Sequence, residues 1–205
     1  ICNPNNPTGT VVTKKQLDEY FARVPEHVLT VVDEAYFEYN QNKDTCSAIV
    51  YLNSGRPLLV LRTFSKIYGL ISARVGYGIT DTEISENMEK CRPPTNVNLV
   101  AEAGALASVD DEETVAKRSE DCLRQKLYLY GEFDKMGLEY TPSEANCVFV
   151  NVVQDSMDIW ARLLTFGVLV RPGKTYACPT WLRVTIGLPE ENEIFVDALR
   201  KVLGG

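Results

Sequence analysis

Two ionisable side chains in this sequence are placed to do chemistry, because each follows a short apolar segment. Residues 58–61 lead toward Lys66, and residues 28–32 lead directly into Asp33. A lysine that is partly desolvated and close to a positive charge can be neutral at working pH, and the neutral amine can attack an aldehyde. An aspartate can stabilise a positive charge beside it. The two side chains are therefore candidates for a catalytic or binding site.

The apolar segments before these side chains decide whether the two can meet. Residues 28–32 and 58–61 are apolar on both faces, which is typical of strands buried in a parallel sheet. Ligands of open α/β sheets bind at the carboxyl ends of the strands, where Asp33, Lys66 and Asn6 could converge. Taken singly, Asp33 could cap a turn and Lys66 could be a solvated surface lysine. The set as a whole favours a binding site.

The elements expected around these residues are a mostly parallel α/β sheet and a smaller α+β part. Thr13 is expected to cap a helix that runs to about Val24, and residues 75–79 form a third strand. Residues 98–135 are mainly helical. After Gly137 the pattern predicts further strands and helices at 147–153, 157–166, 168–170, 182–186 and 190–203. The predicted organisation is part of a large domain (1–108), a connecting helix (109–136) and a small C-terminal domain (137–205).

Composition and charge argue against several classes of function. The chain has 205 residues, of which 45% are hydrophobic and 24% charged, as in an ordinary globular enzyme. The net charge of -7 and the lack of a Lys/Arg run argue against nucleic-acid binding. No apolar stretch reaches membrane-spanning length, and no secretory signal is evident. The six cysteines form no C-x-x-C pair, which argues against a metal site or a disulfide framework and favours the cytoplasm.

The histidine content and the start of the chain narrow the hypotheses further. The only histidine, His27, is expected in a loop, so no Ser-His or Cys-His catalytic pair is available. Ile1 is not a methionine, and a motif dense in asparagine and proline begins at once. We therefore expect the chain to be the C-terminal portion of a longer protein.

Four motifs follow one another in this sequence: Asn3-Pro-Asn-Asn-Pro-Thr-Gly9, Asp33-Glu-Ala-Tyr36, Thr63-Phe-Ser-Lys-Ile-Tyr-Gly-Leu70 and Arg74-Val-Gly-Tyr77. In this order and at these spacings they resemble the fold-type-I aminotransferases. Residues 170–172 and 182–187 are similar to the histidinol-phosphate aminotransferase branch of that family. Any one motif would be weak evidence, whereas the combination is specific. The resemblance covers essentially the whole chain and implies pyridoxal 5'-phosphate (PLP) as cofactor.

The resemblance also implies which residues contact the cofactor. Lys66 would form the covalent imine link with the PLP aldehyde and afterwards carry a proton. Asp33 would pair with the pyridine nitrogen and keep it protonated, which makes the ring an electron sink. Asn6 and Tyr36 would hydrogen-bond the 3-oxygen of the ring.

By the same resemblance, three arginines would bind anions. Arg74, together with Ser65, would hold the cofactor phosphate, to which a guanidinium fork is suited. Arg183 would bind the substrate α-carboxylate, and Arg171 the substrate phosphate. The plainer alternatives are a surface arginine at 183 and an ion pair with a nearby acid at 171. Ser72-Ala73 stands where the family usually has Gly-Leu, which changes local packing and leaves Arg74 in register.

The implied activity is amino-group transfer between histidinol phosphate or imidazole acetol phosphate and 2-oxoglutarate or glutamate, in histidine biosynthesis, by a homodimer. The alternatives are an aromatic or broad-specificity aminotransferase, a threonine-phosphate decarboxylase, and an aminotransferase-like sensor domain of a transcription regulator. A requirement for a 2-oxo acid separates the transaminase from the decarboxylase. The family's glycine-rich turn, its ring-stacking aromatic residue and its dimer arm would all lie before Ile1. The resemblance therefore implies that the chain by itself is a poor enzyme with weak cofactor binding.

Overall fold

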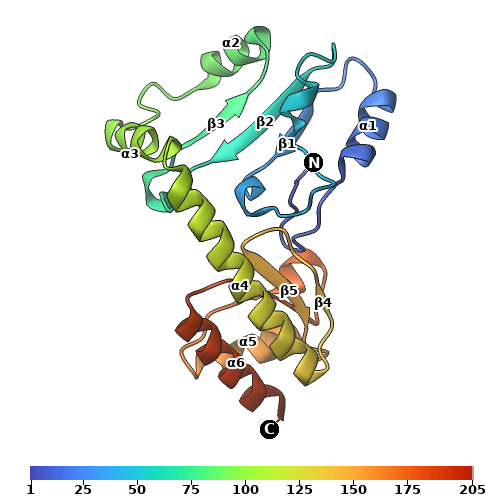
Figure 1. Ribbon diagram of the computed structural model, residues 1–205, viewed down its shortest axis with the longest axis vertical. Helices are drawn as coiled ribbons and strands as arrows, with labels where there is room; N and C mark the ends of the chain where they lie inside the picture. The colour runs from blue at the N-terminus through green and yellow to red at the C-terminus, as the bar shows by residue number, and fades with distance from the viewer. Residues whose placement is uncertain (205) are drawn as a thin grey trace. The chain divides into compact units, whose positions relative to one another are not determined.

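The computed structural model describes residues 1–204, which divide into two compact units. Ile1–Pro4 and Val11–Arg118 form the first unit, and Asn5–Thr10 and the chain from Ser119 onward form the second. The long helix α4, Glu112–Met136, contributes residues to each unit (Figure 1). The domain boundaries expected from the sequence stay a prediction.

The sheet of the first unit has three strands in the order β1-β2-β3, with bounds Thr30–Asp33, Leu58–Thr63 and Gly76–Ile79 (Figure 1). β1 and β2 are parallel, with Val31 opposite Leu59, and Cys2 forms a parallel bridge to Asp33. β3, in contrast, runs antiparallel to β2. The connection between β2 and β3 contains only a 3-10 turn at Ile71–Ala73, and parallel pairing would need a longer crossover, usually a helix.

The helices of the first unit begin with α1, Lys14–Arg23, close to where the sequence predicts one. The Thr13 hydroxyl accepts a hydrogen bond from the Gln16 amide while the Gln16 side chain accepts one from the Thr13 amide, which is a capping box. Leu17 is fully buried in the core of this unit. The remaining helical segments are α2 (Thr82–Cys91), α3 (Leu99–Val109) and 3-10 turns at Phe37–Tyr39 and Ala48–Tyr51.

A buried ion pair joins β2 to the segment that follows β1. The Glu34 carboxylate is fully buried and accepts three hydrogen bonds, from Ser47 Oγ (2.9 Å), Ala48 N (2.6 Å) and Arg62 Nε (2.8 Å). Arg62 also contacts Glu38 at 3.0 Å. Burial raises the pKa of Glu38, and the charge of Arg62 opposes this shift. The network therefore fixes the strand that leads toward Lys66.

Replacing Glu34 by alanine should lower the free energy of unfolding by about 3 kcal/mol, because the Arg62 charge then stays buried with only Glu38 to offset it. Urea unfolding followed by circular dichroism would measure the change. Glu19→Ala, at an exposed position of α1, is the control and should change stability by less than about 0.5 kcal/mol. Equal stability of the two variants would show that the network does not hold this unit together.

The second unit is built on a four-stranded antiparallel sheet in the order β4-β5-β7-β6, with bounds Tyr140–Thr141, Cys147–Asn151, Trp181–Thr185 and Arg171–Pro172. Its helices are the part of α4 from Ser119 onward, α5 (Ser156–Leu164) and α6 (Pro189–Gly204), with a 3-10 turn at Gly173–Tyr176 (Figure 1). These helices share one apolar core with the sheet, in which Leu129, Leu163 and Leu199 meet Val148 and Leu182.

The strand predicted at residues 168–170 is wrong, since the structure places this strand, β6, at Arg171–Pro172. Val168 is buried in the apolar core and Val170 packs against it, without strand pairing. Pairing with β7 begins at Arg171, opposite Arg183. The apolar pattern at 168–170 thus reflects packing against the core.

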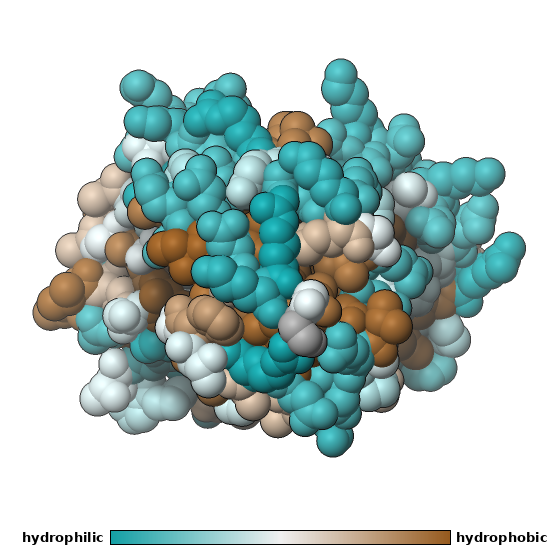
Figure 2. Space-filling model, turned by 90° about the horizontal axis from the view of Figure 1, so that it is seen from below, coloured by the Kyte–Doolittle hydropathy of each residue, from teal (hydrophilic) through white to brown (hydrophobic). Residues whose placement is uncertain are grey.

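The surface of the second unit carries several exposed large apolar side chains, at Leu164, Phe166, Leu169, Leu188 and Ile194. Figure 2 shows brown, apolar residues interrupted by hydrophilic ones, a mixture that is usual for protein surfaces. Within residues 1–204, no helix has the length and apolar character that crossing a membrane requires.

Candidate active site

Four of the predicted cofactor residues line one cavity of about 670 Å³ in the first unit: Asp33, Ser65, Lys66 and Arg74. Asp33 is the last residue of β1, and Ser65 and Lys66 follow the end of β2. Because β1 and β2 are parallel, their carboxyl ends lie at the same edge of the sheet. The topology therefore brings together residues that are far apart in sequence.

Lys66 is half-buried and lies beside an aromatic ring. Its Nζ atom is 5.1 Å from the centre of the Tyr36 ring, and Tyr36 itself is buried. The turn after the lysine is closed by a 2.9 Å hydrogen bond from Gly69 N to Lys66 O, with Gly69 at a φ of 77° that favours glycine. A tight turn thus presents the amine at the cavity.

Ser65 and Arg74 lie side by side on the wall of this cavity. The Nη1 atom of Arg74 is 3.4 Å from Ser65 Oγ and donates a 2.7 Å hydrogen bond to the Ile71 carbonyl. Arg74 has a φ of 58°, which is uncommon for a residue with a side chain and is often found at functional sites. A hydroxyl and a guanidinium side by side form a donor set that fits a phosphate.

Asp33 and Tyr77 also belong to the polar lining of the first unit's cavity. Asp33 Oδ1 accepts a 3.0 Å hydrogen bond from the Ala35 amide, which orients the carboxylate. Burial raises the pKa of the Tyr77 hydroxyl, although Arg62 opposes the shift, so the phenol is neutral at physiological pH. The carboxylate is thus the anionic partner available to a cationic ring nitrogen.

The other three predicted residues, Asn6, Arg171 and Arg183, lie in the second unit. Arg183 Nη1 donates a 3.1 Å hydrogen bond to Asn6 Oδ1. Arg171 stands opposite Arg183 in the pairing of β6 with β7, and both line a cavity of about 440 Å³. The structure therefore groups Asn6, predicted as a cofactor ligand, with the two arginines predicted to bind substrate.

Arg183 has a donor that its surroundings leave unsatisfied. Its Nε atom is buried and has no hydrogen-bond partner within residues 1–204. Within the same residues, neither Arg183 nor Arg171 nor Arg74 forms an ion pair with a carboxylate. A buried, unpaired donor is costly, and a bound carboxylate would satisfy it. These guanidinium groups are thus available for anions.

Two residues that line these cavities, Arg62 and Trp160, were not predicted from the sequence. Arg62 lines the cavity of the first unit and is held by Glu34, but its position within an apolar strand gave only a weak signal. Trp160 lines the cavity of the second unit. Ile159 and Leu163 form the helical stripe that faces the core, and Trp160 lies outside this stripe. A large aromatic residue outside the core-facing stripe is the sequence signal that could have identified Trp160.

The model of the family described as aminotransferase class I and II matches residues 1–199, and the chain therefore belongs to this family. The histidinol-phosphate aminotransferase of Moorella thermoacetica is 46% identical over 204 residues, and that of Caldicellulosiruptor saccharolyticus is 44% identical over 203. The crystal structure of histidinol-phosphate aminotransferase from Sinorhizobium meliloti, in complex with pyridoxal-5'-phosphate, is 25% identical with a TM-score of 0.92. The predicted family and fold class are confirmed.

These comparisons cover the chain almost completely and the relatives only in part. The alignments span 99% of this chain but 53% of the Moorella protein and 57% of the Caldicellulosiruptor protein. The Sinorhizobium structure covers 100% of this chain, which matches 56% of that structure. The chain thus spans about half the length of the curated relatives it matches.

Proposed function

We propose that the protein carrying this chain is a PLP-dependent aminotransferase that transfers an amino group between histidinol phosphate and 2-oxoglutarate in histidine biosynthesis. The observation that carries the proposal is that Asp33, Ser65, Lys66 and Arg74 line one cavity. The relatives at 46% and 44% identity are histidinol-phosphate aminotransferases, which supports the choice of substrate. The resemblance further implies a homodimer in the cytoplasm.

The residues of the first unit fit the cofactor in charge and in chemistry. When bound, PLP supplies an electron-accepting ring next to the amino-bearing carbon of the substrate. Lys66 Nζ is the nucleophile that attaches the cofactor and then moves a proton at that carbon. Asp33 holds a proton on the ring nitrogen, and Ser65 with Arg74 binds the phosphate. Tyr36, which lies next to Lys66, hydrogen-bonds the 3-oxygen of the cofactor ring.

The second unit supplies the contacts to substrate anions. Arg183 binds the α-carboxylate of glutamate, because its buried Nε needs an acceptor and its Nη1 is fixed by Asn6. Arg171, exposed at the start of β6, binds the phosphate of histidinol phosphate. Histidinol phosphate has no carboxylate, so two separate guanidinium groups explain how one enzyme accepts both substrates.

A substrate panel on the purified protein tests the proposed function. We expect histidinol phosphate to be consumed only when 2-oxoglutarate is present, with one glutamate formed for each molecule consumed. Release of carbon dioxide from threonine phosphate without a 2-oxo acid would instead identify a decarboxylase. Faster turnover of aromatic amino acids than of histidinol phosphate would identify an aromatic or broad-specificity aminotransferase.

A further inference from the structure

The second unit buries a lysine that the proposed chemistry does not use. Lys126, on α4, is only 2% exposed, and its Nζ atom donates a 2.8 Å hydrogen bond to the Ser143 carbonyl. Within residues 1–204, no carboxylate forms an ion pair with it. Lysine is almost never fully buried unless it is paired, because desolvating an ammonium group is costly. The contact with Ser143 therefore calls for an explanation.

Ser143 is held from α4 at two points. The Tyr130 hydroxyl, one helical turn after Lys126, accepts a 2.8 Å hydrogen bond from the Ser143 amide. Burial raises the pKa of this phenol, so it stays protonated. The Ser143 hydroxyl in turn accepts a 3.0 Å bond from the Ala145 amide. The backbone at Ser143 is thus fixed on both its donor and its acceptor side.

The loop that carries Asn6 rests on this fixed segment. The Glu144 amide donates a 2.8 Å hydrogen bond to the Gly9 carbonyl. Gly9 has a φ of 70°, and a Cβ atom there would lie 1.9 Å from Ser143 Oγ. Only glycine lets the backbone come this close to Ser143, so the loop packs directly against Ser143.

The same segment also fixes the strand that carries Arg183. The Ile186 amide donates a 2.9 Å hydrogen bond to the Asn146 carbonyl, just before β5 begins. Within the pairing of β5 with β7, Phe149 stands opposite Arg183. Residues 143–146 therefore touch both the loop of Asn6 and the strand of Arg183, whose side chains meet at 3.1 Å.

We propose that Lys126 is a positioning residue whose buried ammonium group, through Ser143, holds Asn6 in hydrogen-bond contact with Arg183. A charge-assisted bond to a carbonyl is stronger than a neutral one, which suits an anchor that two distant segments share. The inference rests on the proposed function insofar as Asn6 and Arg183 contact cofactor and substrate. It adds that a residue without any contact to either ligand determines how well the second unit binds glutamate.

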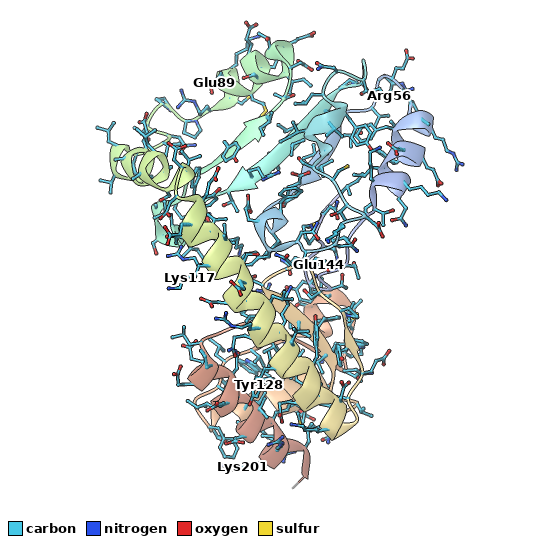
Figure 3. All side chains as sticks on the ribbon, viewed as in Figure 1. Arg56, Glu89, Lys117, Tyr128, Glu144 and Lys201 are labelled. Atoms are coloured by element: carbon cyan, nitrogen blue, oxygen red, sulfur yellow. The ribbon has the colours of Figure 1, made fainter. Side chains whose placement is uncertain are left out.

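The test compares Lys126→Met with Lys117→Met in the protein that carries this chain. Methionine is about as long as lysine and as apolar as its stem, but it cannot donate a hydrogen bond. Lys117 is an exposed residue of the same helix (Figure 3). In Lys126→Met we expect the KM for glutamate to rise by about 10- to 100-fold with a smaller change in kcat, because a small misplacement of Arg183 weakens binding. A merely structural defect would reduce the amount of folded enzyme and leave KM unchanged. Lys117→Met should behave as wild type.

A readout independent of activity is the distance between Asn6 Oδ1 and Arg183 Nη1 in crystals of Lys126→Met, which should exceed hydrogen-bond length. An unchanged distance together with an unchanged KM would overturn the proposal. Should Lys126→Met fail to fold, Lys126→Gln replaces the ammonium group by a neutral donor to the Ser143 carbonyl. Wild-type values of both the KM and the distance in Lys126→Gln would overturn the proposal, because the charge would then be unnecessary. If the wild-type protein does not transaminate, the proposed function fails, and the distance alone still tests the role of Lys126.

Discussion

Replacing Lys66 by alanine should abolish covalent cofactor attachment and nearly all turnover. Lys66 is the only lysine that lines the cavity with Asp33 and Arg74 in the part of the chain that the structure describes. Loss of its proton transfer alone should reduce kcat by about 100- to 10,000-fold, and loss of the covalent link adds to this. Borohydride reduction followed by mass spectrometry of the intact chain would detect the bond between protein and cofactor.

The control for this experiment is Lys15→Ala, at an exposed position of α1. This variant should keep the reducible bond and the turnover of the wild-type protein. A reducible bond that persists in Lys66→Ala would assign the attachment to another lysine. Circular dichroism would verify that Lys66→Ala is folded, so that a loss of turnover reports on the missing amine.

Replacing Arg183 and replacing Arg171 should slow different half-reactions, that with glutamate and that with histidinol phosphate. Arg183→Ala should mainly impair the reaction with glutamate, because its buried Nε and the Asn6 contact prepare it for a carboxylate. Arg171→Ala should mainly impair the reaction with histidinol phosphate. Each loss of a charge-assisted bidentate contact should cost about 2–5 kcal/mol in transition-state binding. Single-turnover kinetics of the two half-reactions would separate the effects.

The matched control is Arg162→Ala, an exposed arginine near the end of α5 that does not line the cavity of the second unit. It should leave both half-reactions unchanged. Equal losses in both half-reactions, for Arg171→Ala and Arg183→Ala alike, would refute the assignment of the two arginines to different substrates. In that case one shared anion site, with both arginines on the same ligand, would replace the two contacts.

Local signals let the sequence by itself predict much of the first unit. Thr13 and Gln16 lie within one helical turn, so the start of α1 depends only on neighbouring residues. The apolar runs before Asp33 and Lys66 mark β1 and β2. Burial on both faces explains the run at residues 58–60 of β2, whereas it is wrong for β1, in which Val31 is exposed between the buried Thr30 and Val32. Since the site residues follow directly on these runs, their motif and their position at the sheet edge could be predicted together.

Other features were decided only by the tertiary structure, because they depend on contacts between residues far apart in sequence. Arg171 begins a strand only because β7 lies beside it. Gly9 belongs with the second unit because its carbonyl accepts a hydrogen bond from Glu144, and no local pattern encodes that pairing. Lys126 looks like an ordinary polar position of a long helix. It is buried because the Ser143 carbonyl supplies the partner that a desolvated ammonium group requires.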